Sequence, residues 1–146
     1  MTQTAIEAGI LATIKLNPEF TEANCKLYDR RPMAKGLARV VVVSYASHTS
    51  EQVTIQNERR KWLYNIDVLA PWRGELAELD TRVAVETQKV IDVLAAHPRL
   101  NGTAGVQRAE VSTVAKPDLI QEKKGGYRGR RHTLEVLEIV NPGRVE

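Results

Sequence analysis

The three histidines of this chain, His48, His97 and His132, are the side chains best suited to bind a metal ion or to transfer protons near neutral pH. No two of them stand at the i, i+4 or His-x-His spacing that would bring two imidazoles to one metal ion. We therefore expect exposed or structural histidines and no metal site. His97 falls at the predicted end of a helix, where a partly charged imidazole would complement the negative end of the helix dipole.

Neither the cysteine nor the carboxylates of the sequence form a recognisable catalytic pattern. Cys25 is the only cysteine, which excludes an internal disulfide and a thiolate cluster for zinc, so we expect it to be a small buried hydrophobic residue. Asp67 is predicted on a strand, whereas Glu75, Glu78 and Asp80 begin a helix whose positive end they would stabilise. The chain has no Gly-x-Ser-x-Gly motif. The sequence therefore predicts no catalytic residue, no cofactor and no enzymatic activity.

The segment KKGGYRGRR carries three glycines, Gly125, Gly126 and Gly129, among basic residues. A phosphate-binding loop would continue with Gly-Lys-Ser or Gly-Lys-Thr and open a helix, and neither follows here. The favoured interpretation is a flexible basic loop between two strands, with a specific phosphate site as the alternative. If it contacts nucleic acid, we expect binding through the phosphate backbone, with Tyr127 able to stack on a base.

Basic residues gather in segments predicted to be loops or strand ends. The net charge of +3 and the pI near 9.1 favour solubility and a mild attraction to anions without specifying a nucleic acid. The clusters comprise Arg30, Arg31, Arg59, Arg60, Lys61, Lys123, Lys124, Arg128, Arg130 and Arg131.

The length of 146 residues suits one domain with one core. The longest stretch without a charged residue, 40–50, has eleven residues, whereas a membrane-spanning helix needs about twenty. The first residues lack a basic region followed by an apolar run and a cleavage site, so the sequence predicts a protein made in a cytosol.

Residues 59–72, RRKWLYNIDVLAPW, alternate with the period of two that is typical of a β-strand. Aromatic and β-branched side chains suit a pleated, half-buried surface, so we expect a strand with one face toward the core. One face would carry Trp62, Tyr64, Ile66 and Val68, and the other Leu63, Asn65, Asp67 and Leu69.

Two segments, residues 4–16 and 75–96, repeat apolar residues at intervals of three and four and predict amphipathic helices. The second would be roughly 30 Å long. The apolar stripe of the first is Ile6, Ile10, Leu11 and Ile14, and that of the second is Leu76, Leu79, Val83, Thr87, Val90, Ile91 and Leu94.

The segment 37–45 contains four consecutive valines, which favours a central strand covered on both faces. Residues 47–52 are polar and predict a turn, after which 53–55 resume the alternation, so the two strands could form an antiparallel hairpin. An unbroken strand over 53–69 would exceed about 50 Å, too long for a compact domain of this size, and part of it is expected to project.

The rest of the chain predicts two more strands, residues 105–115 and a last strand that begins at Tyr127 or Arg131 and ends at Val140. We expect residues 141–146 to be frayed. In the last strand Leu134 and Val136 fall in one phase and Leu137 and Ile139 in the other, which indicates either burial on both faces or a β-bulge.

Together these elements predict a single α+β domain over residues 1–146, with a mostly antiparallel mixed sheet of about four strands packed against two helices. The predicted core comprises Val41, Val43, Trp62, Tyr64, Ile66, Val68, Leu79, Val83, Val90 and Leu94.

The order of these elements resembles the tail terminators and related tail-completion (neck) proteins of long-tailed bacteriophages. Four segments carry the resemblance and cover nearly the whole chain: ARVVVVSY, RRKWLYNIDVLAPW, AVETQKVIDVLAAH and GGYRGRRHTLEVLEIV. In that family a small α+β domain forms a homohexameric ring on the end of the tail tube. The ring stops tube growth and provides the surface for joining the head, leaving a channel for the genome.

The resemblance implies a structural virion protein of the tail or neck, assembled in the host cytoplasm. Its partners would be other copies of the chain, the tail tube protein, the head-tail connector or stopper, and genomic DNA that passes through the channel without sequence-specific contacts. We expect the basic clusters to serve the subunit interface, the tube contact or the DNA channel.

Three alternatives to a terminator remain open from the sequence. The chain could occupy another position in the neck, as a head-completion or stopper protein. The KKGGYRGRR segment could belong to a small basic RNA- or DNA-binding module. The chain could also be a subunit of an enzyme whose active site lies between chains.

Overall fold

The computed structural model describes residues 3–21, 24–27, 39–52, 58–71, 76–103, 105–114, 118–122 and 125–140. Within these residues the chain adopts the predicted α+β fold. Its elements are α1 (Gln3–Ile14), β1 (Cys25–Leu27), β2 (Val40–Gln52), β3 (Glu58–Pro71), α2 (Leu76–Ala96), β4 (Val106–Val114), β5 (Asp118–Glu122) and β6 (Gly125–Val140).

The strands form one mixed sheet with the order β1-β2-β3-β6-β4, and β5 pairs with β6. The pairing of β1 with β2 is parallel, and all the other pairings are antiparallel. The predicted hairpin of β2 and β3 is therefore confirmed. The sheet has six strands rather than about four, because the short strands β1 and β5 give little periodic signal in the sequence.

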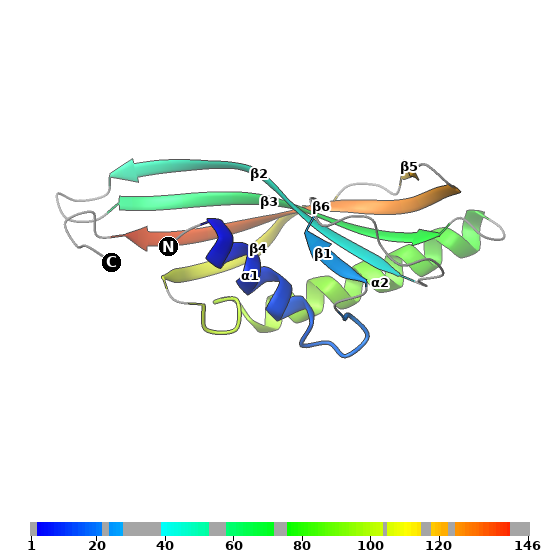
Figure 1. Cartoon of the computed structure of the whole chain (residues 1–146), viewed down its shortest axis with the longest axis horizontal. Helices are drawn as coiled ribbons and strands as arrows, with labels where there is room; N and C mark the ends of the chain where they lie inside the picture. Colours follow the sequence, from blue (N-terminus) through cyan, green and yellow to red (C-terminus); the bar gives the residue numbers. More distant parts are fainter. Residues whose placement is uncertain are drawn as a thin grey trace.

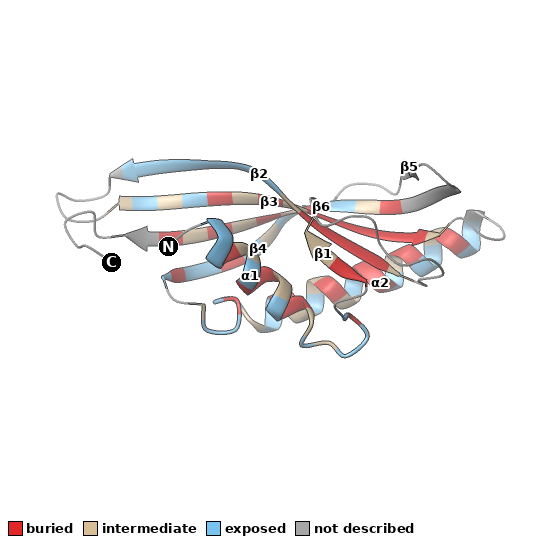
Figure 2. Cartoon of the chain, viewed as in Figure 1, coloured by how far each residue is buried: buried red, intermediate tan, exposed pale blue. Residues whose placement is uncertain are grey.

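The sheet is long and strongly twisted, and both helices lie below it in the view of Figure 1. At one end β2, β3 and β6 extend past both helices. We call this end of the sheet, residues 44–52 of β2, 58–65 of β3, 133–140 of β6 and 106–112 of β4, the distal ribbon; on one face of its inner part, buried residues such as Trp62 and Tyr64 pack in the main core with α1. Figure 2 shows that its β2 edge is exposed from Tyr45 to Glu51, in contrast to the buried segments above α2.

Both helices pack on the same face of the sheet. Ile6, Ile10 and Ile14 of α1 are buried in the main core together with Val90 and Leu94 of α2. At the other end of α2, Leu79 and Val83 form a second buried cluster with Ala70 of β3. Neither described helix combines the length and the apolar composition needed to cross a membrane.

All ten residues expected in the core are buried, with no more than 6% of any of them exposed. Strand β3 shows why the alternation in the sequence is incomplete. Buried and less buried residues alternate up to Ile66, and then five consecutive residues, 66–70, are buried. The strand thus passes from a ribbon with one covered face to a part of the sheet that is buried on both faces. The buried Cys25 matches its expected role as a small hydrophobic residue.

A network of ion pairs ties α2 to the residues around it. The buried Glu86 carboxylate accepts a 2.7 Å hydrogen bond from Arg39 Nε, which lies just before β2. Lys89 Nζ lies 3.2 Å from Glu86 Oε1 and 2.9 Å from Glu19 Oε2 in the turn after α1. The hydrogen bonds that Lys89 donates to Glu19 and Glu86 raise the pKa of Lys89, and the bond that Glu19 accepts from Lys89 lowers the pKa of Glu19. This network fixes the middle of α2 against both the sheet and α1.

Gly9 allows α1 to approach the loop after α2 closely. A methyl group at this position would collide with Thr103 Oγ1, and the Thr103 hydroxyl is held by a 2.6 Å bond to the carbonyl of Leu100. We expect Gly9→Ala to lower the free energy of unfolding by about 1 kcal/mol or more, although alanine favours a helix by about that amount. Urea denaturation measures the change. The double variant Gly9→Ala/Thr103→Ala removes the obstructing atoms. If a double-mutant cycle of unfolding free energies shows no coupling between positions 9 and 103, this contact is not the cause.

The predicted turn over residues 47–52 is wrong, because β2 continues as a strand to Gln52. These polar residues pair with β3 in register from Ser47 opposite Leu63 to Gln52 opposite Glu58. Their side chains are polar on both faces of the strand, and this polarity, which suits a strand beyond the core, favours a turn in the sequence. Residues 53–57 and 141–146, over which alternation and fraying were expected, lie outside the described part of the chain.

The basic loop predicted for KKGGYRGRR is also wrong over residues 125–131, the part of it that the structure describes. Asp118–Glu122 form β5, and β6 begins at Gly125, so the glycines belong to a hairpin strand. The pairing of β6 with β3 runs without a register shift. His132, Leu134, Val136 and Glu138 are buried, and Leu137 on the other face is half-buried. The strand has one core face. Neither burial on both faces nor a β-bulge, the two arrangements expected for its apolar residues, is present in the described part. The bulges lie in β4 instead.

Candidate functional site

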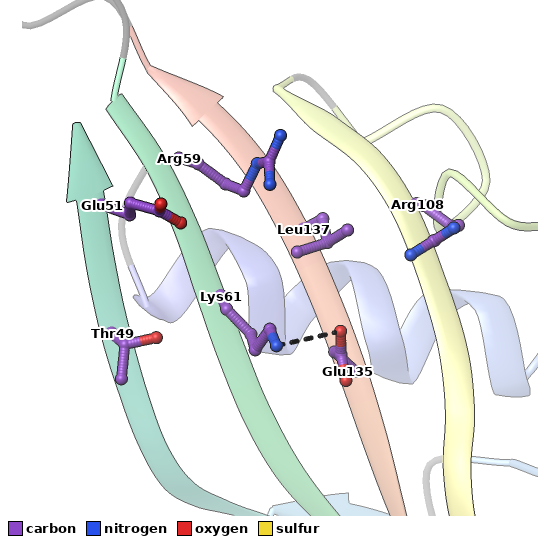
Figure 3. A pocket seen from close by; sticks show the side chains of 7 residues that line it. All are labelled: Thr49, Glu51, Arg59, Lys61, Arg108, Glu135 and Leu137. Carbon is purple, nitrogen blue, oxygen red and sulfur yellow. Dashed lines mark ion pairs between the residues drawn. The ribbon is translucent and has the colours of Figure 1, made fainter. Parts of the chain in front are cut away.

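A row of side chains crosses all four strands of the distal ribbon on the face away from α1. Thr49 lies opposite Lys61, Lys61 opposite Leu137, and Leu137 opposite Arg108. Directly opposed residues of paired strands project from the same face, so the four side chains form one line from the β2 edge to the β4 edge. Figure 3 shows this line on the near side of the sheet, with α1 behind the strands.

This face carries a shallow, charged depression of about 260 Å³. Lys61 Nζ lies 3.5 Å from Glu135 Oε1 at its centre, as the dashed line in Figure 3 shows. At its rim Arg108 Nη2 lies 3.5 Å from Glu110 Oε1 on the same strand. The residues that line it are Thr49, Glu51, Arg59, Lys61, Arg108, Glu135 and Leu137. Both signs of charge alternate here, which suits recognition of another mixed-charge surface better than capture of a polyanion.

The structure brings three of the predicted basic residues, Arg59, Arg60 and Lys61, together on β3, but on two faces. Arg59 and Lys61 point to the charged face. Arg60 projects from the helix side of the sheet, where its guanidinium lies 3.6 Å from Glu58 and 3.9 Å from the buried Glu138. The cluster that looks continuous in sequence is therefore divided between two surfaces.

Arg131 is bound to a buried carboxylate. Its Nε and Nη2 donate hydrogen bonds of 2.7 and 3.0 Å to the two oxygens of Asp67, the residue opposite it on β3. The hydrogen bond and charge of Asp67 raise the pKa of Arg131. The Asp67 side chain is 7% exposed and that of Arg131 56% exposed, so the arginine covers the carboxylate and faces solvent itself. The neighbouring Arg130 is half-buried.

We expect Arg131→Met to lower the free energy of unfolding by about 1–2 kcal/mol at neutral pH, because it leaves the buried Asp67 carboxylate without its cation. The exposure of Arg131 keeps the effect below that of a fully buried pair. Lys61→Met is the matched control, because its partner Glu135 is more exposed and their 3.5 Å contact is weaker. Chemical denaturation should show at most about 0.5 kcal/mol for the control. Equal losses in the two variants would show that burial of Asp67 is not the cause.

The remaining predicted basic residues do not enter the described site. Arg30, Arg31, Lys123 and Lys124 lie outside the described residues. Arg128 is a β6 residue whose backbone pairs with Ala70 and Leu119, and its side chain is outside the description.

On the helix side, the distal ribbon carries an aromatic cluster that the sequence did not reveal. His48 stacks on Trp62 with ring centroids 4.7 Å apart, and Tyr45 meets Trp62 edge-on at 6.3 Å. The Tyr45 hydroxyl lies 2.8 Å from His48 Nδ1. A β-bulge between Tyr45 and Ser47 makes this contact possible. The extra residue places Tyr45 and His48, which are three positions apart, on the same face of β2. His48 therefore lies on strand β2 and not in the expected turn.

The other two histidines differ in their surroundings. His97 follows α2, and its backbone amide donates a 3.1 Å bond to the carbonyl of Leu94, which caps the helix. His132 is buried, neither ring nitrogen has a hydrogen-bond partner among the described residues, and burial lowers its pKa to about 4. No group of three or more metal-binding side chains occurs within the described part of the chain.

Sequence reasoning missed Thr49, Glu51, Arg108, Glu135 and Leu137. They come from three strands, β2, β4 and β6, and only the register of the sheet brings them together. The alternation of charged and apolar residues in each strand was the available signal, but it does not reveal which residues of different strands become neighbours.

No protein-family model matches the chain, and no curated protein matches it. One of the solved structures with a similar fold, a protein known only by a sequence identifier, aligns over 93% of this chain and 96% of its own length. The two chains share 16% sequence identity, and the TM-score is 0.45. A similarity at this level carries no argument about function.

Proposed function

We propose that the chain is a structural virion protein, a bacteriophage tail terminator that forms a ring on the end of the tail tube, stops its polymerisation and offers the surface for head joining. The observation that carries this proposal is the distal ribbon. Its end extends past the helices, and its two edges, residues 44–52 of β2 and strand β4, have no outer strand partner among the described residues. Such edges are an aggregation hazard in a monomer and become interfaces in a closed assembly.

The mixed charge of the ribbon supports an assembly role over a nucleic-acid-binding one. Arg60, Lys61 and Arg108 each lie within 4 Å of a carboxylate of the same chain. Basic residues already compensated in this way attract phosphate less strongly than an unpaired patch would. Filter binding across a salt series tests this point, because submicromolar affinity for DNA or RNA at physiological salt would favour the nucleic-acid module.

Binding to purified tail tubes tests the proposal against another position in the neck. The tube protein encoded in the same genome should be assembled into tubes, mixed with this chain and sedimented. A terminator should bind at about one ring per tube end, whereas a stopper or head-completion protein should remain in the supernatant. Light scattering of the free protein at low salt measures the mass of the assembly, which we expect to be near that of a hexamer.

A further inference from the structure

We infer that two copies of this chain associate head to tail through strand addition, with the β2 edge of one copy pairing antiparallel with the β4 edge of the next. The inference deepens the proposed function, because it names the surfaces that would build the ring. It rests on the direction, register and charge of the two edge strands.

The directions of the strands allow this pairing. From β2 to β3, β6 and β4 every step is antiparallel, so β2 and β4 run in opposite directions. A second copy in the same orientation therefore presents its β2 edge to β4 with the antiparallel sense already correct. A contact of this kind joins two different patches of the chain and can repeat around a ring.

Bulges limit the stretch of β4 that can pair regularly. Register shifts lie between Val106 and Arg108 and between Val111 and Thr113, which leaves residues 108–111 as a regular segment. On β2 the pairing is regular from Ser47 to Gln52, beyond its own bulge. Four residues on each strand can thus be matched one to one.

The faces and charges of these residues select a register. Glu51 and Arg108 both line the charged depression, and they stand at opposite edges of the ribbon. Placing Glu51 of one copy opposite Arg108 of the next puts opposite charges together. The same register sets Ser50 opposite Ala109, Thr49 opposite Glu110 and His48 opposite Val111. Each pair then projects from a single face, as directly opposed residues must.

Charge reversal tests the contact. Glu51→Arg and Arg108→Glu should each weaken self-association about tenfold or more in analytical ultracentrifugation, because each places like charges opposite one another. Mixing the two variants in equal amounts should restore association, since the arginine edges of one then meet the glutamate edges of the other. The double variant Glu51→Arg/Arg108→Glu should also recover it. Thermal melting of each variant verifies the fold.

A cysteine pair tests the register. In Thr49→Cys/Glu110→Cys the two thiols of adjacent copies would be directly opposite, at a separation that suits a disulfide. Mild oxidation at high protein concentration should give a ladder of covalent multimers on a non-reducing gel. Ser50→Cys/Glu110→Cys is the matched control, because it places the thiols on opposite faces, and the native Cys25 is present in both. Equal cross-linking in the two variants, or none in either, would overturn the inference.

The charge variants separate this inference from the proposed function when they are added to growing tail tubes. If Thr49→Cys/Glu110→Cys does not cross-link and Glu51→Arg still ends tubes at the normal length, the edge contact is wrong and the terminator function stands. If the contact forms but tubes grow unchecked, the contact stands and the function fails. Association that responds to Glu51 alone and not to Arg108 would indicate pairing of two β2 edges and would also overturn the inference.

Discussion

Replacing Tyr64 with alanine is expected to lower the free energy of unfolding by about 3–5 kcal/mol, the usual loss for deleting a buried aromatic side chain. Tyr64 is fully buried on the central strand β3, in the main core with residues of both helices. Its ring also meets Tyr45 edge-on at 5.9 Å. The deletion would leave a cavity where the distal ribbon meets α1. Urea denaturation of both proteins should show the loss as a lower midpoint.

Tyr64→Phe is the matched control, because it keeps the ring and removes only the hydroxyl. That hydroxyl makes a 3.5 Å contact with the carbonyl of Gln3, which is long for a hydrogen bond. Burial raises the pKa of Tyr64, so the ring is neutral at physiological pH. We expect phenylalanine to cost no more than about 1 kcal/mol. A loss in Tyr64→Phe as large as that in Tyr64→Ala would place the stabilisation in the hydroxyl rather than in the packing.

Acidification from pH 6.5 to pH 4 is expected to remove about 3 kcal/mol of stability through His132 alone. Burial lowers the pKa of His132 to about 4, against the charge of Asp67, which raises it. In this window the unfolded chain binds a proton at His132 and the folded chain does not, so protonation favours unfolding. The stability that neutral His132 contributes is fully present above pH 6.5 and declines as the pH falls. Below about pH 4 the folded protein also binds the proton, and no further stability is lost.

The variant His132→Leu isolates this effect, because other groups that titrate in the same range remain in both proteins. The difference in unfolding free energy between the two proteins, measured by urea denaturation at several pH values, should change by about 3 kcal/mol across the window. At neutral pH leucine should be tolerated, since it removes two buried ring nitrogens that lack partners among the described residues. A difference that does not vary with pH would mean that the folded protein binds the proton as readily as the unfolded chain.

The fold class followed from the sequence because the strongest periodic signals belong to the elements that make the core. The alternation around Trp62 and Tyr64 and the helical stripe through Leu79, Val83 and Val90 reflect burial on one side, which strand and helix periodicity report directly. The helix predicted over residues 75–96 is observed as α2, Leu76–Ala96, and residue 75 lies outside the described part of the chain.

The β2 edge of the distal ribbon could not be predicted because residues 47–51 are not patterned by burial. Residues 47–51 are exposed on both faces, so they look like a turn, and only pairing with β3 keeps them extended. The same applies to Gly125–Arg131, where glycine and charge suggest a loop but β3 and β5 supply hydrogen-bonding partners. The candidate surface depends on register across four strands and on three bulges, and these properties are set by tertiary pairing rather than by local sequence.

In the proposed role, further copies of the chain complete the edges of the distal ribbon on the end of a tail tube. The proposal explains why a small domain carries a long sheet extension with mixed charge and open edges. The stability of the domain then depends on the buried core under the helices, which includes Tyr64, and on the buried His132.

The most direct test is the length of tail tubes that polymerise in the presence of this chain. Tube protein encoded in the same genome should be assembled with increasing amounts of the chain, and tube lengths measured by electron microscopy. If the chain is a terminator, we expect the mean tube length to fall as the ratio of chain to tube protein rises. A ring of density should cap one end of each tube. Tubes of unchanged length with bare ends, at concentrations where the folded chain is in excess over tube ends, would contradict the proposed function.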